Sequence, residues 1–103
     1  MPEDLDKFIT WWVDYFACAI GKKVTWEWMR RTKNIENGAI GHAYQARGHV
    51  VFNPFIMEIY WQDGDRTEIR NIIAHELTHI RFPDEYHGEN FRAGMKAWTG
   101  KVF

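Results

Sequence analysis

The chain has 103 residues, of which 46% are hydrophobic and 17% are aromatic. Its 13 Lys and Arg residues against 14 Asp and Glu residues give a formal net charge of −1, which does not imply the broad basic surface that tight non-specific nucleic-acid binding requires. The hydrophobic content also excludes a disordered chain, so we predict one globular domain over residues 1–103.

Cysteine usage and the first residues bear on the compartment. The single cysteine, Cys18, cannot form a disulfide within the chain, which favours a reducing compartment. The start, MPEDLDKF, is acidic where a signal peptide is basic, and no run of 18 apolar residues predicts a membrane span. These features predict a cytoplasmic protein. Because Cys18 lies in an apolar run, we expect it to pack against the core.

Residues 3–20 predict an amphipathic helix. Leu5, Trp12 and Phe16 fall at helical spacing, and acidic residues crowd the first turn, where the helix dipole favours them. Gly21 can end the helix. We expect this helix to cover the core; the alternative is that its aromatic face binds a partner or a membrane surface.

Three strands are predicted next, over residues 22–31, 39–46 and 49–53, because apolar and polar residues alternate along them. Residues 32–38 read TKNIENG, a polar loop, and Arg47-Gly48 reads as a tight hairpin turn. Taken in order, the strands predict a three-stranded antiparallel meander.

The second half of the chain predicts further helices. Residues 54–64 form either a short helix or a loop over the core, and residues 88–99 predict a final helix. Between them, residues 65–80 carry isoleucines and a leucine at spacings of three and four, which is typical of an amphipathic helix. Asp65 or Thr67 can cap its start. The predicted fold class is therefore α+β: an N-terminal helix, a three-stranded antiparallel sheet, a helix over residues 65–80 and a C-terminal helix.

The helix over residues 65–80 contains the sequence HELTH, an H-E-x-x-H motif. Residues four apart share one helix face, so the imidazoles of His75 and His79 can converge on one metal ion. Glu76 lies about 100° round the helix and can reach a water instead of the metal. Two nitrogen ligands, an open coordination position and a carboxylate base are what zinc-dependent peptide hydrolysis needs.

A third protein ligand is expected from the turn after this helix. His87 lies eight residues after His79 and precedes Gly88, where backbone can pass close to the site. The flanking Glu85 and Glu89 are the alternative, because a carboxylate can complete such a site. We favour the three-histidine set and predict one zinc ion per chain.

The stretch HELTHIRFPDEYHGENF resembles the SprT-like zinc metallopeptidases and their YgjP-type relatives, whose signature is H-E-x-x-H followed after a short spacer by H-G-x-x-F. The resemblance covers about residues 38–98, and its specific part is the motif region. It implies a minimal gluzincin-type catalytic domain with zinc as cofactor. The matching positions are His75, Glu76, His79, His87, Gly88 and Phe91.

Together these features predict a zinc endopeptidase that hydrolyses polypeptides through a metal-activated water. Its zinc ligands are His75, His79 and His87, and its catalytic base is Glu76. One alternative is a zinc-binding module with little hydrolytic activity that acts in protein interaction, because a short chain leaves little material for a deep cleft. Another is a latent enzyme whose cleft is blocked by its own tail, residues 101–103, or by a second copy through self-association.

Other polar residues could also contribute to such a site. His42 and His49 could each supply a fourth ligand, but we expect them to be surface or hydrogen-bonded sheet residues, because three nitrogens complete a catalytic set. Tyr44 and Tyr86 could donate a hydrogen bond to an oxyanion, although we expect both to pack. Carboxylates in the turn, from Asp84, Glu85 or Glu89, could fix an imidazole tautomer.

Overall fold

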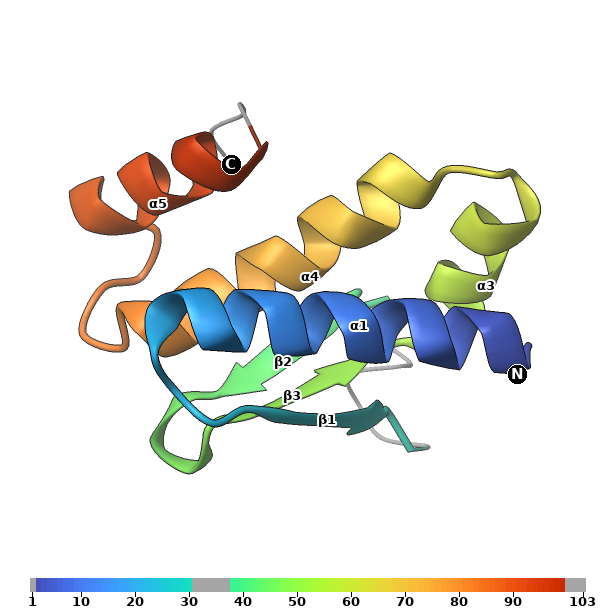
Figure 1. The fold of residues 1–103 in the computed structure, drawn as a ribbon, viewed down its shortest axis with the longest axis horizontal. Coiled ribbons are helices and arrows are strands. Elements are labelled where there is room, and N and C mark those ends of the chain that lie inside the picture. Colours follow the sequence, from blue (N-terminus) through green and yellow to red (C-terminus); the bar gives the residue numbers. More distant parts are fainter. Residues whose placement is uncertain (1, 31–37, 100–103) are drawn as a thin grey trace.

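The computed structural model describes residues 2–30 and 38–99 (Figure 1). The described part is α+β, as predicted, with helices packed over one small sheet. In chain order the elements are α1 (Glu3–Ile20), β1 (Thr25–Trp28), β2 (Gly41–Tyr44), the 3₁₀ helix η1 (Gln45–Arg47), β3 (His49–Phe52), α3 (Pro54–Gln62), α4 (Arg66–Arg81) and α5 (Glu89–Thr99). No described helix is both long enough and apolar enough to cross a membrane.

Three of the helix boundaries have a clear local cause. Gly21 ends α1 in the left-handed conformation, with φ of 67°. The side chain of Asn53 accepts hydrogen bonds from the first backbone N–H groups of α3, and Pro54 occupies its first turn. The Asp65 carboxylate accepts from the Glu68 backbone N–H at 3.1 Å, which confirms Asp65 as the cap of the motif helix α4.

The sheet differs from the predicted meander. Its strand order is β1-β3-β2, with β3 antiparallel to β2 and parallel to β1, so the sheet is mixed. The reason lies in burial: β3 carries three consecutive buried residues, Val50 to Phe52, and such a strand is stabilised at the centre of a sheet. The strand β2 carries a glycine and two exposed side chains and takes an edge.

The predicted strand limits and turns also change. The first strand is shorter than residues 22–31, and the predicted polar loop lies almost entirely within residues 31–37, outside the described residues. The predicted hairpin turn is the helix η1, after which Gly48 adopts φ of 61°. Residues 54–62 are helical, which decides between the two predicted alternatives.

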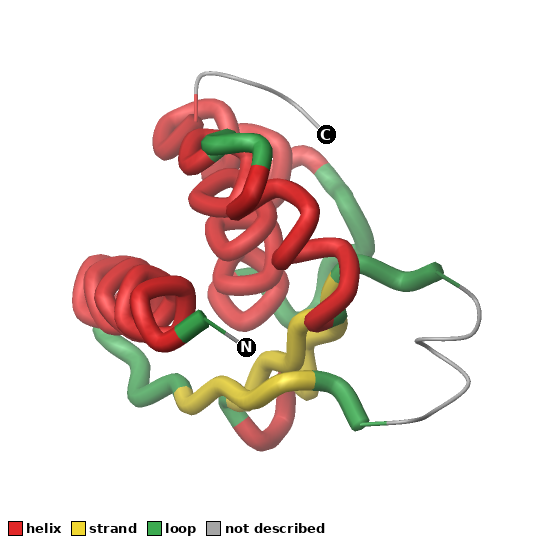
Figure 2. The backbone as a smooth tube through the Cα atoms, turned by 90° about the vertical axis from the view of Figure 1, so that its right-hand side faces the viewer, coloured by secondary structure: helices red, strands yellow, loops and turns green. Residues whose placement is uncertain are grey.

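One face of the sheet is covered by α1 and α4, which lie side by side above it (Figures 1 and 2). The core between these layers is apolar and includes Ile9, Phe16, Phe52, Ile73 and Leu77, all at most 2% exposed. Two tryptophans of β1 also bond to α1: the Trp26 indole donates to Thr10 Oγ1 and the Trp28 indole to Asp6 Oδ1, each at 3.0 Å. Cys18 lies on the outer side of α1 and is exposed, so its predicted packing is wrong.

The last helix, α5, packs against the C-terminal half of α4. Phe91 and Met95 are fully buried there, and Thr78 Oγ1 lies 3.3 Å from the Met95 sulfur. Gly94 allows this close approach, because a Cβ at that position would lie 3.0 Å from the Phe82 ring. The packing fixes the turn between α4 and α5, which carries His87.

Candidate metal centre

Three imidazoles converge between α4 and the turn before α5. His75 and His79 lie one turn apart on α4, and His87 faces both of them. The His87 Nε2 atom is 3.2 Å from His75 Nε2 and 3.2 Å from His79 Nε2. Among the described residues, no other group of three or more His, Cys, Asp and Glu side chains has its ligand atoms within 4.8 Å of one another. The three predicted ligands are thus brought together.

The turn that carries His87 is fixed by a hydrogen bond at each of its two ends. His87 has a φ of 54°, a left-handed conformation that is uncommon for residues other than glycine. At the end of α4, before the turn, Lys22 Nζ donates to the Ile80 carbonyl at 2.8 Å. At the other side, Glu85 Oε1 accepts from the Asn90 backbone N–H at 3.0 Å and so caps α5.

This capping bond bears on the predicted carboxylate alternative. Glu85 is half-buried, and its carboxylate is bonded to the start of α5. A Cβ at Gly88 would also collide with its Oε1 atom. Neither Glu85 nor Glu89 joins the group of ligand atoms. The arrangement therefore favours the histidine set over a carboxylate ligand.

The ring of Phe91 packs against all three imidazoles. Its side chain is fully buried, and its ring centroid lies 5.1 Å from that of His75, 4.6 Å from that of His79 and 4.9 Å from that of His87. Because a buried ring has little freedom to move, it restricts the imidazoles to one arrangement.

Burial and mutual repulsion favour the neutral imidazoles. Desolvation, with smaller contributions from His79 and His87, lowers the pKa of His75 to about 4. Desolvation, with smaller contributions from His87 and His42, lowers the pKa of His79 to about 4. The neutral imidazole is the form that binds metal ions. At neutral pH, His75 and His79 are therefore ready to bind a cation without first losing a proton.

The geometry of these nitrogens fits a metal ion such as zinc. Two ligands that each lie 2.0–2.1 Å from a tetrahedral zinc are roughly 3.4 Å apart, close to the two 3.2 Å separations at His87. The Nε2 atom of His87 carries at most one proton and cannot donate to both neighbours at once. A shared cation satisfies all three nitrogens together. Within the described residues, the buried Nδ1 of His79 has no hydrogen-bond partner, so none of the turn carboxylates Asp84, Glu85 and Glu89 fixes its tautomer.

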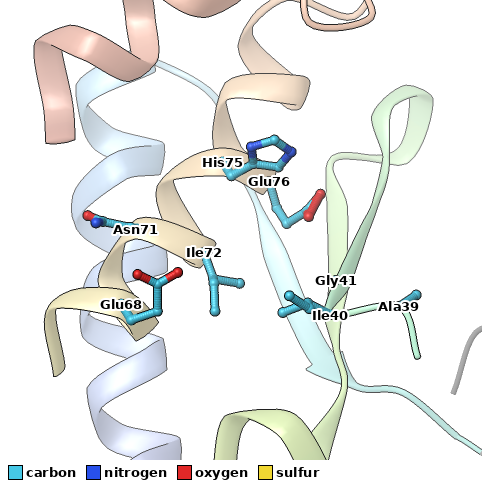
Figure 3. A pocket seen from close by; sticks show the side chains of 8 residues that line it. All are labelled: Ala39, Ile40, Gly41, Glu68, Asn71, Ile72, His75 and Glu76. Atoms are coloured by element: carbon cyan, nitrogen blue, oxygen red, sulfur yellow. The ribbon is translucent and has the colours of Figure 1, made fainter. Parts of the chain in front are cut away.

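Glu76 lies beside this group on the face of α4 that looks toward β2 (Figure 3). Its side chain is only 6% exposed, and desolvation raises the pKa of the carboxyl group to about 7. A carboxyl group with a pKa near 7 can both accept and return a proton at neutral pH. This value describes the metal-free chain, and a cation held by the three imidazoles would lower it.

Gly41 is a site residue that the sequence analysis did not identify. It is the first residue of β2, and a Cβ built there would lie 2.9 Å from Glu76 Oε2. Its missing side chain therefore lets the strand approach the carboxylate. A glycine inside an alternating strand pattern is the available sequence signal, because it often marks a close approach of backbone to another group.

Two cavities open on either side of this contact, and both are lined by Gly41, His75 and Glu76. One cavity has a volume of about 380 Å³. It is lined by the three imidazoles, by residues of β2 and by Tyr86. The other, of about 330 Å³, extends along α4 toward its N-terminus (Figure 3). Its lining residues are Ala39, Ile40, Gly41, Glu68, Asn71, Ile72, His75 and Glu76.

The remaining predicted candidates divide into near and distant residues. His42 is exposed and lines the larger cavity together with Tyr86, which is 86% exposed and stacks its ring near His79. His49 bonds to Thr25 Oγ1 at 2.7 Å within the sheet, as expected for a hydrogen-bonded sheet residue. Tyr44, which is 37% exposed, packs against the rings of His42 and His49, whereas the expected packing is wrong for Tyr86.

Comparison of this chain with protein-family models, with curated proteins and with solved structures finds no match. The functional interpretation therefore depends on the geometry of the site and on the motif.

Proposed function

We propose that this chain is a zinc-dependent endopeptidase, similar in its active-site motif to the SprT-like group. The observation that supports this most is the convergence of three imidazole nitrogens beside a buried carboxylate, with His87 Nε2 at 3.2 Å from each of the other two. His75, His79 and His87 would hold the zinc. The bound metal would supply a water of lowered pKa and polarise the carbonyl group of the scissile bond.

Glu76 is the proposed general base. Its carboxylate takes the proton of the attacking water and then passes it to the leaving amine. Position supports this role, since the buried Glu76 carboxyl group lines the same cavity as the three imidazoles. Gly41 is the proposed positioning residue, because its lack of a side chain leaves room for the carboxylate.

The proposed polypeptide substrate lies extended along β2. This strand is at one edge of the sheet and pairs only with β3 among the described residues, so the described part of the chain leaves its other edge unpaired. Backbone hydrogen bonds along such an edge bind a peptide largely irrespective of its side chains. The cavities on both sides of Glu76 then offer space to side chains on either side of the scissile bond. We propose a cytoplasmic location, since the single cysteine suits a reducing compartment.

Metal analysis paired with a degradation assay tests this function. Purified protein should contain one zinc per chain and degrade casein; a chelator should abolish the degradation, and added zinc should restore it. Zinc binding without turnover under any condition would favour the alternative, a zinc-binding interaction module. Turnover that appears only on dilution or after C-terminal trimming would instead indicate a latent enzyme that self-associates or blocks its own cleft.

A further inference from the structure

The cavity of about 330 Å³ differs in chemistry from the metal-binding cavity (Figure 3). One wall is a ridge of α4 that runs from Glu68 through Ile72 to Glu76, and the other is the start of β2 with Ile40. Glu68 and Glu76 are eight residues apart, which is about 12 Å along a helix. The cavity thus begins at the proposed reaction centre and ends near a second carboxylate.

Most of this cavity suits an apolar chain. Ala39, Ile40 and Ile72 contribute aliphatic surface between its two ends. In Figure 3 the Ile72 side chain points from α4 toward Gly41 and Ile40, between Glu68 and Glu76. A ligand that reaches Glu68 from the reaction centre must therefore be long and must contact aliphatic groups on the way.

Glu68 has no cationic partner among the described residues. The nearest arginines along α4 are engaged elsewhere: Arg66 donates to the Trp61 carbonyl at 2.8 Å and covers the Trp61 ring, and Arg70 lies over the ring of Trp12. The ion pairs formed within the described part of the chain do not include Glu68, and the cavity lining contains no Lys or Arg. Within the described part of the chain, no basic side chain therefore competes with a ligand for the half-buried Glu68 carboxylate.

We propose that this cavity binds a lysine or arginine side chain of the substrate and that Glu68 determines this specificity. The inference rests on the proposed peptidase function and adds a substrate class to it. A basic side chain has an aliphatic stem for the apolar walls and a cation for the carboxylate at the far end. A purely apolar side chain of the same length would satisfy the walls and leave Glu68 unpaired.

Three peptides of one sequence test the proposal, with lysine, norleucine or glutamate at a single central position. Norleucine has the aliphatic stem without the charge. The zinc-loaded protein should cleave the lysine peptide with a kcat/KM about tenfold above that of the norleucine peptide, as one charge-assisted hydrogen bond warrants. Glu68→Gln should remove this preference and bring the ratio of the lysine to the norleucine peptide close to one. A wild-type ratio near one, or a ratio that survives Glu68→Gln, would overturn the proposal.

A binding measurement separates this proposal from the peptidase function. Zinc-loaded Glu76→Gln should bind the lysine peptide about tenfold more tightly than the norleucine peptide by fluorescence anisotropy, whether or not the wild type turns over. Absence of cleavage of all three peptides would then count against the peptidase function alone, and equal dissociation constants would overturn the subsite.

Two features of the chain make Glu68→Gln a clean variant. The capping bond from the backbone N–H of position 68 to Asp65 is kept in the variant, and the loss of the first-turn carboxylate costs at most about 1 kcal/mol of helix-dipole stabilisation. Glu58→Gln is the matched control, because Glu58 lies on α3, bonds to Gln62 and does not line the cavity. It should leave the ratio of the lysine to the norleucine peptide unchanged.

Discussion

Gly41 on β2 lies directly against the carboxyl group of Glu76 on α4. A Cβ added to Gly41 would lie 2.9 Å from Oε2 and 3.1 Å from Cγ of that side chain. Either the carboxylate or the strand must therefore move when position 41 gains a side chain. The contact links the edge strand to the proposed catalytic base.

Gly41→Ala should lower activity while leaving the metal in place. A displacement of about 1 Å at a catalytic group can reduce the rate about 10²-fold, so we expect kcat to fall by roughly 10- to 100-fold. The zinc content should stay at one per chain, because position 41 does not belong to the ligand set. Steady-state kinetics and elemental analysis of the same preparation check this. An unchanged kcat would show that the carboxylate needs no such space.

The motif helix was predictable from the sequence because its signals are local. Periodicity defines α4, and the cap at Asp65 acts within one turn. His75 and His79 follow from the helical spacing alone. The third ligand, His87, needed the motif resemblance as well, since its approach depends on a turn and on packing against Phe91.

The arrangement of the strands and the roles of Gly41 and Glu85 were not predictable in the same way. Strand order depends on which strand is buried on both faces, and this is decided by contacts between segments far apart in the sequence. Position 41 needs a glycine because β2 lies close to the Glu76 side chain on α4, and this distance is set by tertiary packing. Glu85 caps a helix that begins four residues later, which its turn position did not indicate.

Substitutions in the turn should separate metal binding from helix capping. His87→Ala should weaken zinc binding strongly, because a ligand is lost. Glu85→Ala should keep the zinc and reduce the free energy of unfolding by about 1 kcal/mol, because the bond to Asn90 at the start of α5 is lost. Glu89→Ala is the control, since Glu89 is exposed and outside the ligand group.

Zinc competition with a chromophoric chelator and denaturant unfolding measure the two effects in the turn variants. Loss of zinc in Glu85→Ala, with His87→Ala unaffected, would reverse the ligand assignment.

The stability of the metal-free protein should depend on pH through Glu76. Its pKa is about 7 in the folded chain and about 4.5 when exposed, so the folded state binds more protons between these values. The contribution of the protonated, buried carboxyl group is therefore fully present below pH 4.5 and is lost as pH rises through 7. Glu76→Gln removes this dependence. Between pH 5 and 8 the variant should gain stability relative to the wild type, on the order of 3 kcal/mol.

His75 and His79 change the stability with pH in the opposite direction to Glu76. Both are present in the wild type and in Glu76→Gln, so their effect cancels in this comparison. The pKa values of His75 and His79 are lowered from 6.5 to about 4, so the unfolded state binds more protons between these values. Their contribution is present above pH 6.5 and is lost as pH falls toward 4. Urea unfolding of both chelator-treated proteins is measured at each pH. The difference between their free energies of unfolding gives the contribution of Glu76. Parallel stability curves would show that the carboxyl group is not desolvated as described.

The most direct test of the central claim compares the wild type with Glu76→Gln, each loaded with zinc, by elemental analysis and peptide hydrolysis on the same samples. The amide has nearly the same shape as the carboxyl group but cannot accept the proton of the attacking water. We predict one zinc per chain in both proteins, hydrolysis by the wild type, and a loss of at least about 10²-fold in the variant. A variant that hydrolyses peptides at the wild-type rate, or one that loses its zinc, would contradict the assignment of Glu76 as the base beside a three-histidine zinc site.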